Sequence, residues 1–235
     1  MQKMWLAGLA MLGAGALTVG YGIAPAAADD YAGDTLVRIQ GTVVMPDSSA
    51  KVQSPPGTPI PGASADVSTE VIPTLTITHF FTKNVAAELF CCFGKFNAEG
   101  KGTAINGADL GDFWVFPPIV TLQYHFDPVA GFKPYVGAGV QYIHFFDGGM
   151  SDLGARIKLD DAWGFALQGG VDVEIGHGWY LNADIKKVWL DTDASWDGAA
   201  RAKVTVDPLI VSAGLGYRFN FADLLAGRSA PAPLK

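Results

Sequence analysis

The sequence has little cysteine, with only Cys91 and Cys92 among 235 residues. Adjacent residues of a β-strand point to opposite faces, so these two thiols are not expected to form a disulfide with each other. Two cysteines also provide neither a disulfide framework nor a metal site. We therefore predict a chain without a metal, and no motif in it indicates a cofactor.

Long apolar runs are absent beyond the N-terminus. The one long run, from Met4 to about Ile23, follows Lys3 and ends at Ala26-Ala27-Ala28. This order is that of a secretory signal peptide, which predicts residues 1–28 as the signal and Asp29 as the mature start. The alternative is an uncleaved membrane anchor, because the run is nearly long enough to span a bilayer. No later stretch approaches 18 consecutive apolar residues, so no transmembrane helix is expected to follow.

Basic residues are also scarce, with 16 Lys and Arg against 23 Asp and Glu. The formal net charge of −7 becomes −8 when the signal is removed, because Lys3 is its one charged residue. This balance argues against a nucleic-acid partner. The 207 residues left (235 minus 28) fit one domain, and 29 glycines with 11% aromatic residues are typical of a β-rich chain.

What the mature chain does contain is a repeated alternation of apolar and polar residues. In AWGFALQGGVDVEI (162–175), Trp163 and Phe165 share one face of a strand, whereas Gln168, Asp172 and Glu174 share the other. Similar runs of about ten residues or more, the length of a membrane-spanning strand, occur eight times. They are Leu36–Val44, Val71–Thr82, Val85–Phe96, Trp114–Phe126, Phe132–Phe146, Ala162–Ile175, Trp179–Asp191 and Lys203–Phe219.

The connections between the runs alternate in length. Those after runs two, four and six are short (83–84, 127–131 and 176–178), and the other four are longer (46–70, 97–113, 147–160 and 192–202). A soluble β-sandwich has no reason to sort its loops in this way, whereas outer-membrane barrels have short periplasmic turns and long extracellular loops. Aromatic residues at both ends of the runs agree with two interfacial girdles. We predict an all-β, eight-stranded antiparallel transmembrane β-barrel over residues 29–219, located in the cell outer membrane with its apolar faces toward lipid.

Several segments resemble the OmpW/AlkL family of outer-membrane proteins of Gram-negative bacteria. The most specific are KPYVGAGVQY (133–142), the pair Pro117-Pro118 and the closing DP…GLGYRF (207–219). The resemblance implies an eight-stranded barrel that lets small hydrophobic molecules cross the outer membrane. Two features depart from the family: CCFGKF (91–96) stands where a proline-containing segment is usual, and the chain continues sixteen residues past Phe219.

Strand parity also predicts which side chains face the lumen. An eight-stranded barrel is about filled by its own side chains, or holds one small ligand. Inward positions near the extracellular end are apolar and predict a funnel with Phe90 as its floor: Val44, Phe90, Ile143, Phe145, Val188, Leu190, Val204 and Val206. Inward positions toward the periplasm are charged or amidic, and because unpaired buried charges are costly they predict a mutually paired plug. These are Arg38, Glu88, Asp172, Glu174, Asn182, Asp184, Lys186 and Arg218.

A funnel above a plug predicts sideways exit of small hydrophobic solutes into the outer-membrane lipid. Proline removes a hydrogen bond from a strand ladder, and four prolines lie in the extracellular parts of the runs: Pro73, Pro117, Pro118 and Pro208. They mark a possible lateral opening. The alternative is that they only end strand pairing at the rim of the barrel.

Two other functions are compatible with such a barrel. Some outer-membrane barrels are enzymes that use a histidine at the outer rim, but His79, His125, His144 and His177 lie on different elements, and His144 fits an interfacial polar residue better than a base. We therefore predict no enzyme. The other alternative is a closed structural or adhesive barrel acting through its loops, of which the first (48–69) is rich in Pro, Ser, Gly and Ala.

The C-terminal end of the sequence bears on how the barrel is assembled in the membrane. Tyr217 and Phe219 fit the aromatic-ended last strand that barrel assembly machinery recognises, so this machinery is a predicted partner. Residues 220–235 have too little apolar content for a domain and are predicted to form a disordered periplasmic tail.

Overall fold

The computed structural model describes residues 31–53, 58–102, 105–146, 148–152, 154, 156–196 and 200–221. The predicted signal peptide (1–28) and nearly all of the predicted tail (220–235) lie outside these residues, so both stay predictions. No helix within the described ranges is long and apolar enough to cross a membrane.

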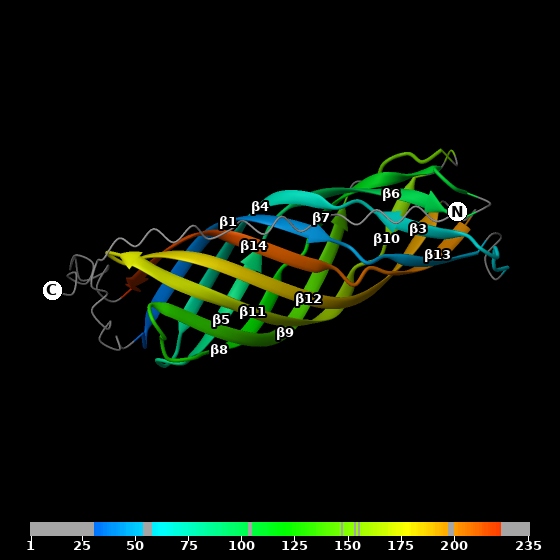
Figure 1. The fold of residues 1–235 in the computed structure, drawn as a ribbon. Coiled ribbons are helices and arrows are strands. Elements are labelled where there is room, and N and C mark those ends of the chain that lie inside the picture. Colours follow the sequence, from blue (N-terminus) through cyan, green and yellow to red (C-terminus); the bar gives the residue numbers. More distant parts are fainter. Residues whose placement is uncertain are drawn as a thin grey trace, which may run out of the picture.

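Eight antiparallel strands form a barrel that closes on itself (Figure 1). The ring consists of β1 (Asp34–Met45), β4 (Glu70–Phe80), β5 (Val85–Cys91), β8 (Ile119–His125), β9 (Phe132–Phe146), β11 (Ala162–Gly176), β12 (Trp179–Trp196) and β14 (Leu209–Asn220). Closure is made where β1 pairs with β14 over its whole length, from Asp34↔Asn220 to Met45↔Leu209. The predicted fold is confirmed.

The outer wall of the barrel is apolar and exposed. Trp163 is 70% exposed, Ile39 69% and Leu122 61%. The residues directly before and after each of them in the sequence face the inside of the barrel. Water would oppose so much exposed apolar surface on a monomeric domain, but a bilayer favours it. The alternation therefore places the polar faces inside the barrel.

The wall continues as a second tier of strands, whose lower edge still carries exposed apolar side chains such as Phe93 and Trp114 and whose upper part extends past the membrane. β12 has 18 residues, which reach about 60 Å at roughly 3.4 Å each, well beyond the ~25 Å apolar band of an outer membrane even when tilted. The tier is made by β2 (Ser49–Gln53), β3 (Ser64–Val67), β6 (Gly94–Lys101), β7 (Asp109–Phe116), β10 (Ile157–Leu159) and β13 (Ala200–Thr205). It lies at one end of the barrel, opposite the short turns (Figure 1). Much of the predicted long connections is therefore strand.

Two of the predicted runs are interrupted in the structure. The run 85–96 divides into β5 and β6 at Cys92 and Phe93, and the run 114–126 divides into β7 and β8 at Pro117 and Pro118. The two breaks face each other, since β5 pairs with β8 as far as Phe90↔Ile119 and β6 pairs with β7 from Gly94↔Val115 onward. Two adjacent prolines offer no N–H to a ladder, which explains why pairing stops there.

Candidate functional site

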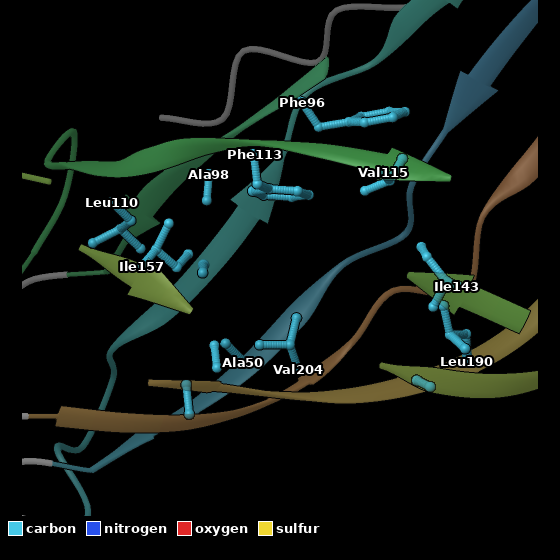
Figure 2. Close-up of a cluster of buried hydrophobic side chains, with 14 of the residues drawn as sticks. Ala50, Phe96, Ala98, Leu110, Phe113, Val115, Ile143, Ile157, Leu190 and Val204 are labelled. Carbon is cyan, nitrogen blue, oxygen red and sulfur yellow. The ribbon is translucent and has the colours of Figure 1, made fainter. Parts of the chain in front are cut away.

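The lumen is divided along the barrel axis into an apolar half and a polar half. The apolar half holds a cavity of about 80 Å3 that is open at its mouth. Its wall is built from inward side chains of both tiers of strands, and Figure 2 shows Leu110, Phe113 and Leu190 among those that surround it. Alanines such as Ala65, Ala98 and Ala194 leave the space that larger side chains would fill.

The structure places most of the predicted funnel on this wall. The lining includes Val44, Phe90, Ile143, Phe145, Leu190, Val204 and Val206. Val188 is fully buried and packs in the same apolar cluster without lining the cavity. Phe90 lies at the boundary with the polar half, because its ring centroid is 4.9 Å from the Nζ atom of Lys186.

Several large side chains of the wall were missed by the sequence prediction. These side chains lie in or at the edge of segments that the sequence predicts as loops, yet they line the cavity in its upper part: Leu110, Phe113, Ile157 and Trp196. The Trp196 indole N–H donates to the Leu110 carbonyl at 3.2 Å and ties two of these segments together. The signal that could have identified two of them is the apolar residue at every second position, as in Phe113 with Val115 and Ala194 with Trp196.

Below Phe90 a buried ionic network crosses the lumen. Arg38 of β1 donates from Nε and Nη2 to the two carboxylate oxygens of Asp172 on β11, at 3.0 and 2.7 Å. Its Nη1 donates to Glu88 Oε2 on β5 at 3.0 Å and to Thr78 Oγ1 at 2.7 Å. The charged side chains of all three residues are at most 2% exposed. This arginine therefore links strands from different sides of the barrel.

A second cation extends the network. Lys186 Nζ lies 3.2 Å from Glu88 Oε1 and also contacts Asp184. Gln168 Nε2 donates to Glu88 Oε1 and to Asp184 Oδ2, at 2.8 Å each, and the Tyr135 hydroxyl donates to Asp184 at 2.9 Å. Buried charges are tolerated when each is paired and hydrogen-bonded, which is the situation here.

The predicted plug corresponds to this network with two exceptions. Six of its members take part: Arg38, Glu88, Asp172, Asn182, Asp184 and Lys186. Asn182 joins by donating to Asp172 Oδ1 at 2.9 Å. Arg218 is buried in a lower layer, and Glu174 is exposed at the periplasmic end of β11.

That lower layer surrounds Tyr31, a buried residue that the sequence prediction did not single out. Lys133 Nζ lies 3.1 Å from the centroid of the Tyr31 ring, and Arg218 Cζ lies 4.2 Å from it. The Tyr31 hydroxyl oxygen is 3.3 Å from that of Tyr180. A ring between two cations closes the periplasmic end beneath the network. Because Tyr31 precedes the first alternating run, periodicity gave no signal for it.

One stretch of the wall beside the apolar cavity has no strand ladder. β4 pairs with β5 up to Leu75↔Cys91, and above this level β4 pairs with β1 alone. β6 pairs with β7 and β3. Among the described residues, no ladder therefore joins Glu70–Thr74 to Gly94–Asn97, and we call this stretch the β4–β6 seam.

Side chains close the β4–β6 seam. Ile72, Cys92 and Phe96 line the cavity at this level. Packing is tight, since a methyl group added at Gly94 would lie 2.8 Å from the Phe96 ring and 3.6 Å from Ile72 Cδ1. Above the seam, the Ser68 N–H donates to the Asn97 carbonyl at 3.0 Å.

The four predicted prolines lie in different situations. Pro73 is exposed on the part of β4 at the seam that pairs with β1 alone. Pro117 and Pro118 lie between β7 and β8. The Pro118 carbonyl accepts from Tyr142 N–H at 3.1 Å, which joins this segment to β9. Pro208 is buried, and its carbonyl accepts from Val188 N–H at 3.0 Å. Of the four, only Pro73 lies where pairing with a neighbouring strand is missing over several residues.

The fold and the divided lumen define the class of protein: an eight-stranded outer-membrane β-barrel with an apolar cavity at one end of its lumen and an ionic network at the other. The profile of the OmpW family matches residues 31–219. The chain belongs to the OmpW family, as its sequence predicted.

Individual relatives and solved structures agree with this membership. The chain is 36% identical over 191 residues to "Uncharacterized outer-membrane protein y4mB" of Sinorhizobium fredii, covering 78% of this chain and 79% of that one. It is 35% identical over 188 residues to "Dibenzothiophene metabolism operon protein PahQ" of Pseudomonas aeruginosa, covering 77% and 87%. The crystal structure of the outer membrane protein OprG from Pseudomonas aeruginosa matches with a TM-score of 0.75 and 29% identity, covering 80% of this chain and 97% of that one. The predicted location in the outer membrane is confirmed.

Proposed function

We propose that this barrel passes small hydrophobic molecules from the extracellular side into the outer membrane. A solute enters the apolar cavity through its mouth, stops above the ionic network, and leaves through the β4–β6 seam into lipid. The observation that supports this best is the position of the seam, because Ile72 and Phe96 belong both to the cavity wall and to the seam.

Energetic reasons favour lateral over axial exit. Axial passage would break paired charges in a low-dielectric lumen, and removing one member of such a pair is strongly unfavourable. Opening the seam moves apolar side chains and breaks no ladder hydrogen bond, and the lipid outside is as apolar as the cavity. The two routes therefore differ in the kind of contact that must be broken.

The relatives suggest a class of solute. PahQ is named for a dibenzothiophene metabolism operon, and dibenzothiophene is a flat, apolar aromatic molecule. The cavity wall includes the rings of Phe90, Phe96, Phe113 and Phe145. Aromatic rings pack well against such solutes. Aromatic hydrocarbons and their sulfur analogues are therefore the first solutes to test.

A cross-link across the seam tests the route. Cysteines replacing Ile72 and Phe96, in a chain with Cys91→Ala and Cys92→Ala, are joined by a short bifunctional thiol reagent in cells that express the protein. We expect uptake of naphthalene to fall to the level of cells without the protein. The matched control joins Val43→Cys to Val71→Cys, which are register partners of the intact β1–β4 ladder, and should leave uptake unchanged.

Two results would contradict the proposal in different ways. Normal uptake through the cross-linked seam would exclude this exit. No protein-dependent uptake in the unmodified chain would favour the alternative of a closed structural or adhesive barrel that acts through its loops.

We also infer that the barrel is not an enzyme. His144 Nδ1 contacts Asp161 Oδ2 at 2.7 Å, and its ring packs edge-on against Phe146. Neither partner is a nucleophilic hydroxyl, and the pair lies on the exposed outer face. Lipid hydrolysis by the purified protein that disappears in His144→Ala would overturn this inference.

A further inference from the structure

Gln141 differs from every other residue described on the cavity wall. It lies on β9, is 2% exposed, and lines the cavity in register with Ile119 on β8 and Gly164 on β11. Its Oε1 atom accepts no hydrogen bond from the described residues. An amide oxygen without a donor in apolar surroundings is unfavourable, so this position is unusual in a wall that is otherwise almost entirely apolar.

The other end of the amide faces the backbone of a neighbouring segment. Gln141 Nε2 donates to the Pro117 carbonyl at 3.5 Å, and in this orientation Oε1 is the unpaired atom. At this length the bond is weak, and the terminal amide torsion is soft, so the oxygen can turn toward a donor in the cavity.

Thr192 provides the contrast within the same wall. Its hydroxyl also belongs to a residue that lines the cavity, but it donates to the Asp160 carbonyl at 2.6 Å. The polar group of Thr192 is therefore used by the fold, whereas the acceptor of Gln141 is not.

We propose that Gln141 is a hydrogen-bonding anchor for solutes that have an apolar body and one donor group, such as phenols and naphthols. The proposal rests on the function proposed above and adds a preference to it. The donor of the solute meets Oε1, and the rest of the solute contacts apolar wall. A second polar group would find no partner there and would be disfavoured.

Two probes of nearly equal shape test the anchor. 1-Naphthol can donate a hydrogen bond, and 1-methoxynaphthalene cannot. Their dissociation constants are measured with the full-length mature barrel in lipid nanodiscs, after subtraction of binding to empty discs. The preference for the naphthol is the dissociation constant of the ether divided by that of the naphthol. We expect this ratio to be about fivefold larger in the unmodified protein than in the variant Gln141→Met.

Two further variants serve as checks. Gln141→Leu is another apolar substitution at the same position, in case Gln141→Met does not fold. It should also lose the preference for the naphthol. Thr192→Val removes a hydroxyl from the same wall and should keep it, because that hydroxyl is already bonded within the protein.

The possible outcomes separate this proposal from the proposed function. Equal preference in the unmodified protein and the Gln141 variants, with both probes still bound, would overturn the anchor and leave the hydrophobic pathway intact. A water molecule that donates to Oε1 in place of the solute would give the same result. Failure of both probes to bind the unmodified protein would overturn the cavity as a solute site and the anchor with it.

Discussion

The two halves of the lumen are made by the same strands but filled in opposite ways. In the upper half, β12 contributes Leu190 and Ala194, whose size and apolarity leave a cavity. Lower on the same strand, Lys186 and Asp184 reach into the lumen and join a charged network. An eight-stranded ring has a fixed width, so the choice of side chains alone decides whether a level is open or closed.

The largest expected effect follows from breaking the polar half at its centre. Arg38→Met leaves Asp172 buried without the cation it pairs with and removes one of the two cations next to Glu88, which should lower the free energy of unfolding by about 3–5 kcal/mol. Urea unfolding in lipid bilayers, monitored by the gel mobility of the folded barrel, measures it. Lys203→Met removes an exposed cation from the upper tier and should have little effect, because its side chain is 63% exposed. Equal effects of the two variants would refute the paired network.

The lower aromatic layer should give the next largest effect. Tyr31→Ala removes a buried ring that lies between Lys133 and Arg218, and we expect a loss of about 2–4 kcal/mol in the same assay. Tyr31→Phe keeps the ring and loses only the contact with the Tyr180 hydroxyl, so it should remain close to the unmodified protein. If both variants lose the same stability, the hydroxyl rather than the ring is responsible.

A charge placed in the apolar half should impair function more than stability. Leu190→Asp puts a carboxylate on the cavity wall, and a solute must pass this hydrated group, so uptake of naphthalene should fall about tenfold. Initial rates in cells with matched amounts of protein measure the effect. Leu190→Met keeps an apolar side chain of similar size and should retain uptake. Unchanged uptake by Leu190→Asp would exclude this cavity as the route.

An exposed ion pair provides the smallest effect and a reference for the buried ones. Lys83 and Asp127 lie 2.7 Å apart in the periplasmic turns, where hydrogen bonds from Lys83 and Asn84 lower the pKa of Asp127 below its ordinary value of 3.8. A lowered pKa stabilises the fold above the ordinary value, and this contribution is lost as the pH falls through the lowered one. The difference between Asp127→Asn and the unmodified protein should therefore be small at pH 7 and should shrink further as the pH falls below 3.8. A large loss at pH 7 would contradict this contrast between exposed and buried pairs.

Periodicity predicted much of this molecule because a barrel imposes an alternation of two along each strand. Arg38, Glu88 and Asp172 are far apart in sequence, yet parity alone assigned each of them to the lumen, and lumen charges must find partners. Alternation does not identify Tyr31 as a buried residue, because Tyr31 precedes the first strand. It does not place Phe113 and Trp196 on the cavity wall, because both lie in long connections that the sequence predicts as loops. The β4–β6 seam depends on strand register, which alternation does not determine; Pro73 marked its place without showing which neighbour was missing.

The division of the lumen can be tested most directly with a solute that is visible to X-rays. Crystals of the full-length mature barrel soaked with 1-bromonaphthalene would locate the bromine by its anomalous scattering. We expect a bromine peak in the upper half, above Phe90 and beside Phe113, Phe145 or Leu190. A peak below Phe90 among Arg38, Asp172 and Lys186, or no peak in the cavity, would contradict this division of the lumen.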